Sequence, residues 1–356
     1  MEVRQLFDHI SCTYTYLVFD KSTKEAVLVD PVYELFLRDD ALIDELGLKL
    51  VTTIETHIHA DHVTSAWLFK QKRKSQITIS KSSGAVHADR LLVHGDAILV
   101  GSSKLIAIAT PGHTNGCMSY ASNNHTFVLT GDALLVRGTG RTDFQEGSSS
   151  RLFKSVRDHI FSLPDDCMVF PGHDYNGIMS STVGEERRFN PRLGGKLSEG
   201  DFISSMENLN LAHPNKIDQA VPANTNCGIV NDDHLLNSAP LWAKLRFTFA
   251  GNWDIDAVEL NNVMKKVSII DVRSLEEFNG PLGRLPGSSH LPLESVSIEA
   301  LANYQDRHVV FVCRAGGRSV QALKNAGLFK DSNSASLRGG IIAWRSLGLN
   351  VENGSD

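Results

Sequence analysis

Short apolar runs separated by turns fill the first 180 residues of the chain. Runs rich in Val, Ile and Thr and bounded by Gly, Asn or Asp are typical of buried or half-buried strands. They predict strands at residues 15–20, 25–30, 48–57, 104–113 and 125–134. Helical spacing between some of these runs predicts helices over residues 36–47 and 62–74. Strands that alternate with helices indicate an α/β layered fold.

The middle of the chain, from about residue 185 to residue 250, lacks this regularity and is rich in Asn and Pro. One helix is expected there over residues 198–211, with Ser198 as its cap and Asp201 closing a capping box. The polar, turn-rich sequence at residues 222–242 is interpreted as a domain edge and linker.

A second α/β pattern begins near Asn252. Its predicted elements are a helix over residues 256–266, strands at 267–272 and 307–313, and a helix over 319–327. We therefore expect two domains, residues 1–230 and 252–356, joined by a linker at residues 231–251.

Composition narrows the class of protein. The 356 residues are 42% hydrophobic and 21% charged, which excludes a disordered, collagen-like or coiled-coil protein. The net charge of -6 lacks the basic excess that nucleic acid or an anionic membrane would favour, and no apolar stretch approaches the ~20 residues of a membrane span. Five scattered cysteines without a C-x-x-C pair favour a reducing compartment, so we expect a cytoplasmic protein.

Side chains of the metal-ligand type follow several of the predicted strands. The first group lies in THIHADH, residues 56–62, and the others lie in Gly-containing turns further along. The seven residues are His57, His59, Asp61, His62, His113, Asp132 and His173. Imidazole and carboxylate groups gathered at one point bind divalent metals, and α/β folds place their sites where strands end. The sequence therefore predicts a metal centre.

This order of motifs, HxHxDH followed by Gly-His, Gly-Asp and a second Gly-His, resembles the metallo-β-lactamase superfamily over roughly residues 1–230. The resemblance implies an αββα sandwich with the metal at one edge of its two sheets. It leaves the reaction open, because the superfamily includes zinc hydrolases, thioesterases and iron oxygenases. The seven side chains suffice for one metal on His57, His59, His113 and Asp132 and a second on Asp61, His62 and His173.

Three further stretches, GRTDFQ (140–145), DYNG (174–177) and residues 207–224, resemble the persulfide dioxygenases, the iron branch of the superfamily. That resemblance implies one Fe(II) per chain, held by His57, His113 and Asp132. It also implies that glutathione persulfide is oxidised by O2 to sulfite, with release of glutathione. A 2-His-1-carboxylate face leaves open positions on iron, whereas zinc has no redox chemistry. The residues left to orient ligands or hold water are then His59, Asp61, His62 and His173.

Glutathione is anionic, so its site needs fixed polar or cationic contacts. Arg141 and Tyr175 are the candidates, because both lie close to the ligands in sequence. Two alternatives stay open, a structural ion pair between Arg141 and Asp143 and a packed ring for Tyr175.

The second domain contains a short loop, CRAGGRS (313–319), between a predicted strand and a helix. Gly316 and Gly317 let such a loop gather backbone N–H groups around Cys313, a nest that binds anions and favours a thiolate. Arg314 and Arg318 add positive charge. Cysteine phosphatases usually place this Arg six residues after the Cys, where this chain has Ser319, so the shorter loop favours a sulfane sulfur over a phosphate.

The rest of this domain agrees with a sulfurtransferase. IIDVRSLEEF (269–278), GRLPGSSHLPL (283–293) and LRGGIIAW (337–344), with the Cys313 loop, resemble a rhodanese domain over about residues 252–350. The resemblance implies that Cys313 takes the outer sulfur of thiosulfate and passes it to glutathione. Asp271 and Arg273 are expected to brace the fold or the loop.

Together the two halves resemble persulfide dioxygenase–rhodanese fusions, which act on small molecules: glutathione persulfide, glutathione, thiosulfate and O2. The oligomeric state is left open, with a homodimer as one option. One alternative is a zinc-dependent glutathione thioester hydrolase, similar to glyoxalase II, with an appended rhodanese domain. Another is a non-enzymatic sulfide or redox sensor, although no DNA-binding element accompanies it.

Overall fold

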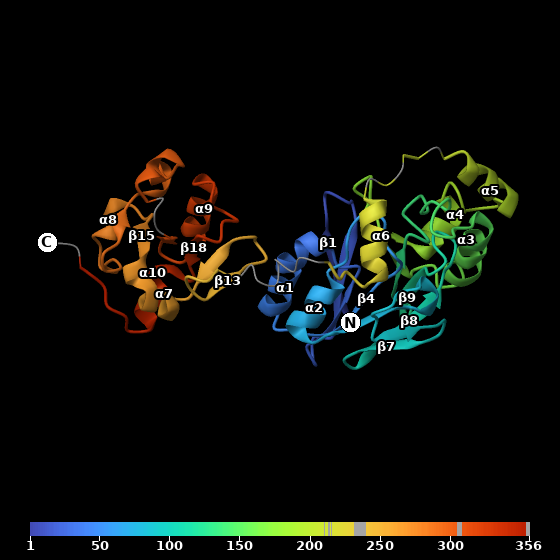
Figure 1. The fold of residues 1–356 in the computed structure, drawn as a ribbon, viewed down its shortest axis with the longest axis horizontal. Helices are drawn as coiled ribbons and strands as arrows, with labels where there is room; N and C mark the ends of the chain where they lie inside the picture. The colour runs from blue at the N-terminus through green and yellow to red at the C-terminus, as the bar shows by residue number, and fades with distance from the viewer. Residues whose placement is uncertain (210, 213, 215, 231–239, 305–307, 354–356) are drawn as a thin grey trace. The chain divides into compact units, whose positions relative to one another are not determined.

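The computed structural model describes residues 1–209, 211–212, 214, 216–230, 240–304 and 308–353. The chain forms two compact units, coloured along the sequence in Figure 1. Unit 1 comprises residues 1–36 and 46–233, and unit 2 comprises residues 37–45 and 234–356. Residues 231–239 of the expected linker lie outside the described residues, so the limits of the two domains stay a prediction.

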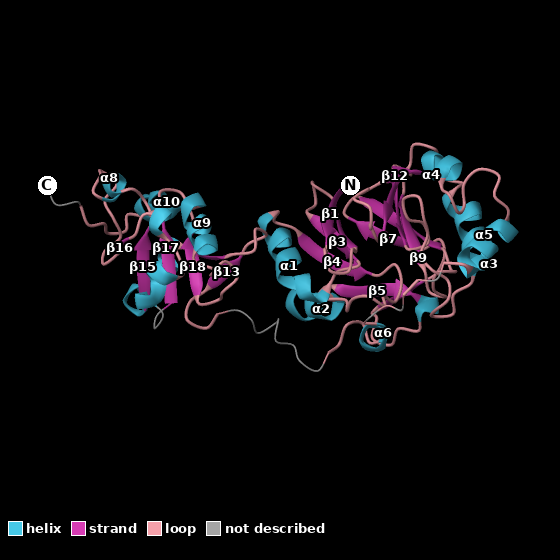
Figure 2. Ribbon diagram, turned by 90° about the horizontal axis from the view of Figure 1, so that it is seen from above, coloured by secondary structure: helices cyan, strands magenta, loops and turns pink. Residues whose placement is uncertain are grey.

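Unit 1 is built on two six-stranded sheets (Figure 2). The first contains, in spatial order, β1 (Glu2–Phe7), β2 (Tyr14–Phe19), β3 (Glu25–Val29), β4 (Lys49–Ile54), β5 (Gln76–Ser80) and β6 (Arg90–Leu92). The second contains β12 (Ser181–Thr182), β11 (Met168–Pro171), β10 (Phe127–Gly131), β9 (Met118–Ser122), β8 (Ser103–Ala109) and β7 (Ala97–Val100). Strands β3 to β6 run parallel, whereas most of the second sheet is antiparallel.

Helices cover the outer faces of both sheets. The helices of unit 1 are α2 (Ala66–Arg73), α3 (Ser149–Ser155), α4 (Val183–Phe189), α5 (Glu199–Glu207) and α6 (Ile217–Thr225). Val27 and Leu129 belong to a core between the sheets, while Leu152 and Phe202 pack behind the second sheet. Helix α2 contacts β4 and β5 of the first sheet. The αββα sandwich is thus confirmed.

The segment interpreted as irregular contains more helix than expected. Helix α5 has the predicted capping box between Ser198 and Asp201. Helix α6, residues 217–225 with Pro222 inside it, was not predicted, and only its last four residues fall in the segment 222–242 that was interpreted as edge and linker. Asn and Pro weaken a helical signal in the sequence. The side chain of Asn224 makes hydrogen bonds with a loop that is distant in sequence, described below.

Unit 2 is a parallel sheet with one antiparallel edge strand. Its order is β13 (Leu245–Phe247), β14 (Trp253–Ile255), β18 (Ser334–Leu337), β17 (His308–Val312), β15 (Val267–Asp271) and β16 (Ser289–His290). Its helices are α7 (Ala257–Val263), α8 (Leu275–Phe278), α9 (Gly317–Asn325) and α10 (Gly340–Ser346), and α1 (Phe36–Glu45) begins at the last residue of the first segment of unit 1. β13 lies where the linker was expected.

Separate apolar clusters cover the two faces of this third sheet. Leu260 and Trp344 pack on one side, and Leu323 and Ala326 pack on the other. Strands buried on both faces read as continuous apolar runs, which is why β15 and β17 were visible in the sequence without alternation.

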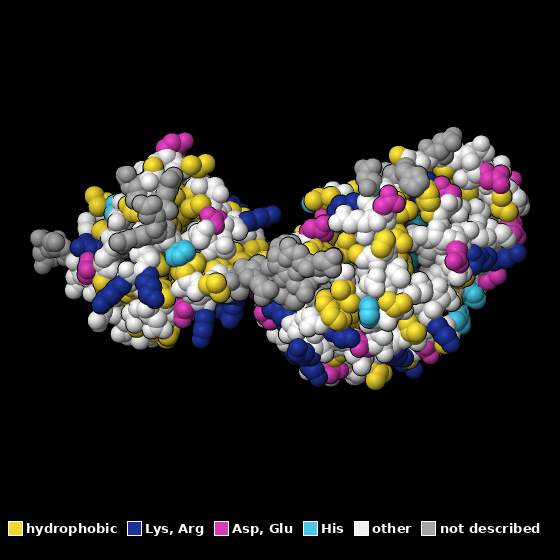
Figure 3. Space-filling view, in the orientation of Figure 1, with side chains coloured by type: hydrophobic (Ala, Val, Ile, Leu, Met, Phe, Trp, Pro, Cys, Tyr) yellow, Lys and Arg dark blue, Asp and Glu magenta, His cyan; other side chains and the backbone are white. Residues whose placement is uncertain are grey.

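The face drawn in Figure 3 carries Lys and Arg side chains interspersed with Asp and Glu. Within the described part of the chain, no helix combines the length and the apolar character needed to cross a membrane.

Candidate metal centre and cysteine site

Three predicted ligands meet where strands of both sheets end. His57 follows β4, His113 follows β8, and Asp132 follows β10. One ligand atom from each lies within 4.8 Å of the others, and the ring centroids of His57 and His113 are 4.9 Å apart. His113 Nε2 lies 3.6 Å from Asp132 Oδ2. Two imidazoles and one carboxylate on one face form a donor set that fits a divalent transition metal.

Contacts behind the ligands fix their orientation. His113 Nδ1 lies 2.6 Å from the carbonyl of Arg141. A carbonyl only accepts, so Nδ1 must donate, and in a neutral imidazole Nε2 then has the lone pair. Glycines permit this close packing, since a Cβ on Gly140 would lie 2.8 Å from His113 Nδ1 and one on Gly172 would lie 2.6 Å from Asp132 Oδ1.

The electrostatic surroundings favour the forms that bind a metal. Burial, together with the neighbouring His59 and His113, lowers the pKa of His57 well below its usual value, so its ring stays neutral. Burial alone would raise the pKa of the Asp132 carboxyl, but the neighbouring His173, His113 and His57 together hold that pKa below the usual range. Neutral imidazole and ionised carboxylate are the ligating forms.

The other predicted residues form a second group beside the first. Asp61 Oδ2 lies 2.9 Å from His62 Nδ1 and 3.1 Å from His173 Nε2, and it also accepts from Thr13 at 2.9 Å. The opposite nitrogen of His173 lies 2.7 Å from Asp132 Oδ1. His173 thereby links the two carboxylates and orients Asp132.

His59 faces this group with Nδ1, which lies 3.9 Å from Asp61 Oδ1, and directs Nε2 to other carboxylates. Its Nε2 lies 3.1 Å from Asp30 Oδ1 and 3.7 Å from Glu55 Oε2. Burial lowers the pKa of His59, but the carboxylates of Asp30, Asp61 and Glu55 together raise it to about 9. A cationic imidazole does not bind a metal. Ligand atoms of His59, Asp61 and His62 nevertheless lie within 4.8 Å of one another, so a second metal is geometrically possible.

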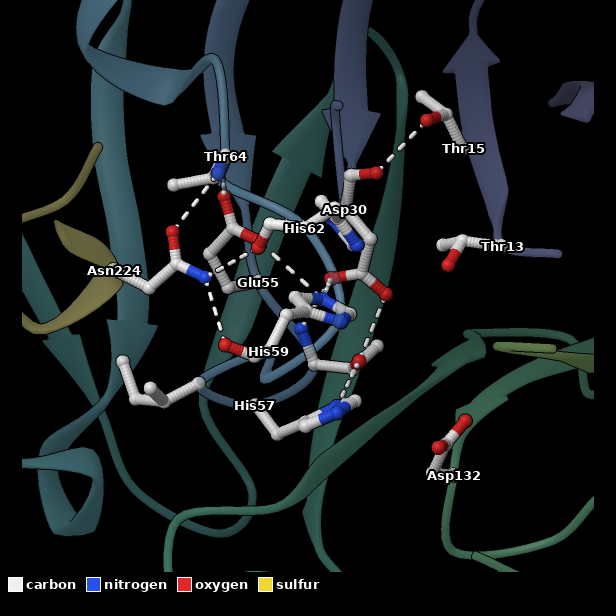
Figure 4. A network of polar contacts seen from close by, with 12 residues as sticks. Thr13, Thr15, Asp30, Glu55, His57, His59, His62, Thr64, Asp132 and Asn224 are labelled. Atoms are coloured by element: carbon white, nitrogen blue, oxygen red, sulfur yellow. Dashed lines mark hydrogen bonds and ion pairs between the residues drawn. The ribbon is translucent and has the colours of Figure 1, made fainter. Parts of the chain in front are cut away.

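Sequence reasoning missed a polar network behind the histidines (Figure 4). Asn224 of α6 donates to the carbonyls of His59 and His62 at 2.9 and 2.8 Å and accepts from the Thr64 amide at 2.9 Å. Thr64 in turn donates to Glu55 at 2.6 Å. Asn224 lies more than 160 residues from this loop, so no spacing in the sequence connects them.

A cavity of about 620 Å³ opens onto the metal-ligand group. Arg141 and Tyr175, the candidate glutathione contacts, both line it, and so does Lys216, which sequence reasoning missed. Arg141 makes two 2.7 Å contacts to Asp143 and also donates to two carbonyls, of Leu211 and Ala212. The structural ion pair considered for Arg141 is therefore present.

Tyr175 and Lys216 are the more accessible polar side chains of this cavity. Tyr175 is 68% exposed and stacks on His173, with ring centroids 5.7 Å apart. Lys216 Nζ lies 3.2 Å from Glu34 in a partly exposed ion pair.

The cysteine loop of unit 2 directs one backbone amide, that of Gly316, at the Cys313 sulfur. Cys313 follows β17, is 1% exposed, and its Sγ accepts from the Gly316 amide at 3.1 Å. The hydroxyl of Ser319, a residue not predicted to contribute, lies 3.6 Å from the same sulfur. The amide of Ile341 donates to the Cys313 carbonyl at 2.9 Å, and a Cβ on Gly340 would lie 2.3 Å from that oxygen. The LRGGIIAW motif therefore holds the loop from behind.

The charged residues around this loop differ in their partners. Arg314 is exposed to solvent. Gly317 is the first residue of α9. Arg318 pairs with Glu277 of α8 through contacts of 2.5 and 2.7 Å. Arg273 and Asp271 form a fully buried pair at 2.6 Å that also reaches the carbonyl of Gly283, as expected of a brace.

These features define a metallo-β-lactamase fold with a histidine–aspartate cluster, followed by a rhodanese-like domain. Residues 12–173 match the metallo-beta-lactamase superfamily, and residues 256–347 match the rhodanese-like domain. A metallo-beta-lactamase of Staphylococcus aureus shares this fold across 95% of the chain and 98% of its own length, with a TM-score of 0.61 and 24% identity.

Closer relatives cover unit 1. Human mitochondrial persulfide dioxygenase ETHE1 is 50% identical over 228 residues, which is 64% of this chain and 89% of the human protein. The crystal structure of ETHE1 from Myxococcus xanthus is 48% identical with a TM-score of 0.62, and the match covers 64% of this chain and all of that chain. The chain belongs to the ETHE1 persulfide dioxygenase family and carries a rhodanese-like domain in addition.

Proposed function

We propose that unit 1 oxidises glutathione persulfide with O2 at a single Fe(II) held by His57, His113 and Asp132. The observation that carries the proposal is the convergence of these three ligand atoms within 4.8 Å in a chain half identical to a persulfide dioxygenase. Bound iron would supply redox chemistry and open positions for sulfur and O2. The pairing of His59 with Asp30, and of His173 with two carboxylates, supports one metal over two.

The overall reaction balances as glutathione persulfide, O2 and water giving glutathione and sulfite. The terminal sulfur is oxidised, O2 is reduced, and glutathione leaves with a proton on its thiol. The chain's own residues bind and orient the substrate in the cavity of about 620 Å³. Tyr175 and Lys216 present a hydroxyl and an ammonium to it, while Arg141 builds its wall.

Unit 2 is proposed to transfer sulfane sulfur between thiosulfate and glutathione through Cys313. The thiolate attacks the outer sulfur of thiosulfate, the S–S bond breaks, and sulfite leaves. The thiol of glutathione then takes that sulfur and regenerates the Cys313 thiolate. The Gly316 amide stabilises the sulfur anion, while the Ser319 hydroxyl donates its proton to the Gly316 carbonyl and so fixes that residue of the loop. The product of this unit would be the substrate of unit 1.

The decisive experiment is O2 uptake by iron-reconstituted protein on addition of glutathione persulfide, with sulfite measured in parallel. The matched controls are His113→Ala, which removes a proposed ligand, and His87→Ala, which removes an exposed histidine outside the cluster. Uptake lost only in His113→Ala, with about one iron per chain, is the expected result.

A zinc-dependent glutathione thioester hydrolase remains the second candidate, because His59, Asp61 and His62 also gather their ligand atoms. It predicts two metals per chain and hydrolysis of S-acyl glutathione without O2 uptake. That combination would overturn the dioxygenase. The cytoplasmic location and the oligomeric state stay predictions.

A further inference from the structure

A buried carboxylate is connected to the metal ligand His57 through one hydroxyl group. Asp30 directly follows β3 and has a left-handed backbone conformation, with φ of 50°. Its Oδ1 accepts from the Thr56 amide at 2.7 Å and its Oδ2 accepts from the Thr56 hydroxyl at 2.8 Å. That hydroxyl oxygen lies 2.9 Å from His57 Nδ1. All three side chains are at most 2% exposed, and Asp30 and His57 are labelled in Figure 4.

The direction of these hydrogen bonds follows from counting protons. Thr56 has one hydroxyl proton, and a carboxylate oxygen can only accept, so that proton points to Asp30. The hydroxyl oxygen is then an acceptor toward His57, which places a proton on Nδ1. A neutral imidazole with its proton on Nδ1 has a lone pair on Nε2, the nitrogen left to face a metal.

Asp30 is held firmly in this role. Its amide donates to the Ile54 carbonyl at 3.0 Å, and its carbonyl accepts from the Thr15 hydroxyl at 2.8 Å. These contacts hold Asp30 in its left-handed conformation. Such backbone strain persists where the surrounding structure determines the conformation.

We propose that Asp30 and Thr56 are positioning residues that set the tautomer of His57 and so prepare it to bind the metal. The inference rests on the proposed metal centre of unit 1. It assigns to Asp30 a role that acts through Thr56 rather than by contact with metal or substrate.

The proposal predicts that Asp30→Asn changes the tautomer of His57. The Thr56 amide needs an acceptor, so the oxygen of the new side chain must stay at the Oδ1 position and its NH2 group must replace Oδ2. That NH2 donates to the Thr56 hydroxyl, whose proton then turns toward His57 Nδ1. The imidazole proton moves to Nε2 and blocks the lone pair. Thr56→Val removes the hydroxyl, and with it the preference for a proton on His57 Nδ1, but does not favour a proton on Nε2. Thr56→Ser keeps the hydroxyl.

The first measurement is the His57 tautomer in metal-free protein, by long-range ¹H–¹⁵N NMR of ¹⁵N-histidine-labelled samples, with His57→Gln to assign the signals. The second is Co(II) affinity, followed by its visible absorption. We expect the Nδ1–H tautomer in the parent protein and in Thr56→Ser, and the Nε2–H tautomer in Asp30→Asn. Co(II) affinity should fall roughly tenfold in Thr56→Val and roughly 100-fold in Asp30→Asn.

The control is Thr53→Val, which removes another buried hydroxyl next to the same strand end but only a 3.4 Å contact to the Gln76 carbonyl. It should leave both tautomer and affinity unchanged. A parent protein with Nε2–H on His57, or Thr56→Val and Thr56→Ser binding Co(II) equally, would overturn the proposal even if Asp30→Asn fails to fold. A parent protein that binds no Co(II) contradicts the proposed metal centre instead, and the NMR measurement still decides the tautomer.

Discussion

The two units place their chemistry in opposite ways. In unit 1 the ligands come from loops after β4, β8 and β10, so residues 57, 113 and 132 meet only when two sheets have formed. In unit 2 the sulfur of Cys313 accepts from Gly316, three residues away, and lies beside Ser319, six residues away. One site is assembled from distant segments, and the other is largely one loop.

This difference changes what supports each site. The assembled site depends on contacts behind each ligand, such as the Arg141 carbonyl on His113 and His173 on Asp132. The loop site depends on a backbone hydrogen bond from the start of α10, where the Ile341 amide donates to the Cys313 carbonyl. We therefore expect substitutions behind the ligands to impair unit 1 by degrees, whereas unit 2 depends chiefly on one atom, the Cys313 sulfur.

The largest expected effect in unit 1 comes from His113→Ala. Loss of one of three ligands should release the metal and reduce O2 uptake with glutathione persulfide to background. Sulfur transfer from thiosulfate should continue at the parent rate, because the proposed nucleophile is in the other unit. Metal content and both activities should be measured on one preparation, and loss of both activities in a folded variant would contradict separate sites.

Cys313→Ser is the reciprocal change in unit 2. Replacing the nucleophilic sulfur should lower sulfur transfer from thiosulfate by roughly 10⁴-fold or more. O2 uptake with supplied glutathione persulfide should be retained. Cys117→Ser is the matched control, since that buried thiol makes hydrogen bonds with Thr114 alone among the described residues and burial raises its pKa to about 12. Transfer that survives in Cys313→Ser would exclude a cysteine persulfide.

The same comparison explains which features of the two sites could be predicted from the sequence. The Cys313 loop and its Gly316 amide were predictable because nest geometry is local. The seven metal-type side chains were recognisable by residue type, and the structure brings them together. Asp30, Thr56, Asn224 and Lys216 were not, because their roles come from tertiary contacts; Asp30 looked like the polar end of an apolar run.

The α/β layers followed from apolar patterns, and every predicted strand and helix overlaps an observed one. Helix α6 was missed because its sequence, IDQAVPANT, contains Pro222 and two polar residues near its end. The helix presents Asn224 to the histidine loop, so long-range hydrogen bonds compensate for its weak propensity.

The next effect by size tests the brace of unit 2. Asp271→Ala leaves the buried guanidinium of Arg273 without its carboxylate, which should destabilise the fold by about 3–5 kcal/mol. Urea denaturation followed by sulfurtransferase activity measures this. Arg338→Ala removes an exposed partner of Asp256 and should cost less than about 1 kcal/mol. Equal effects of the two variants would show that the buried pair is no brace.

A smaller effect is expected at the cavity of unit 1. Lys216→Met should raise the KM for glutathione persulfide about two- to fivefold with kcat unchanged, because a partly exposed ammonium contributes uniform binding. The KM for cysteamine persulfide, which has no carboxylate, should not change. Lys154→Met removes an exposed lysine paired with Glu199 and serves as the control. An equal rise in KM for both substrates would exclude recognition of a carboxylate.

The smallest expected effect is a pH dependence beside the Cys313 loop. Pairing with Arg318 lowers the pKa of Glu277 from its usual 4.5 to about 2. Because the pKa of the folded state is the lower one, the pair stabilises unit 2 above about pH 4.5, and this stabilisation is lost as the pH falls toward 2. The gap in unfolding free energy between the parent protein and Glu277→Gln should be below about 1 kcal/mol at pH 7. Urea titrations from pH 6 to pH 2.5 should show that gap closing. Glu276→Gln, which removes a charge from the same helical turn, should show no such closure. If the difference in unfolding free energy for Glu277→Gln does not change with pH, the stability comes from helix capping by Glu277 and not from its ion pair with Arg318.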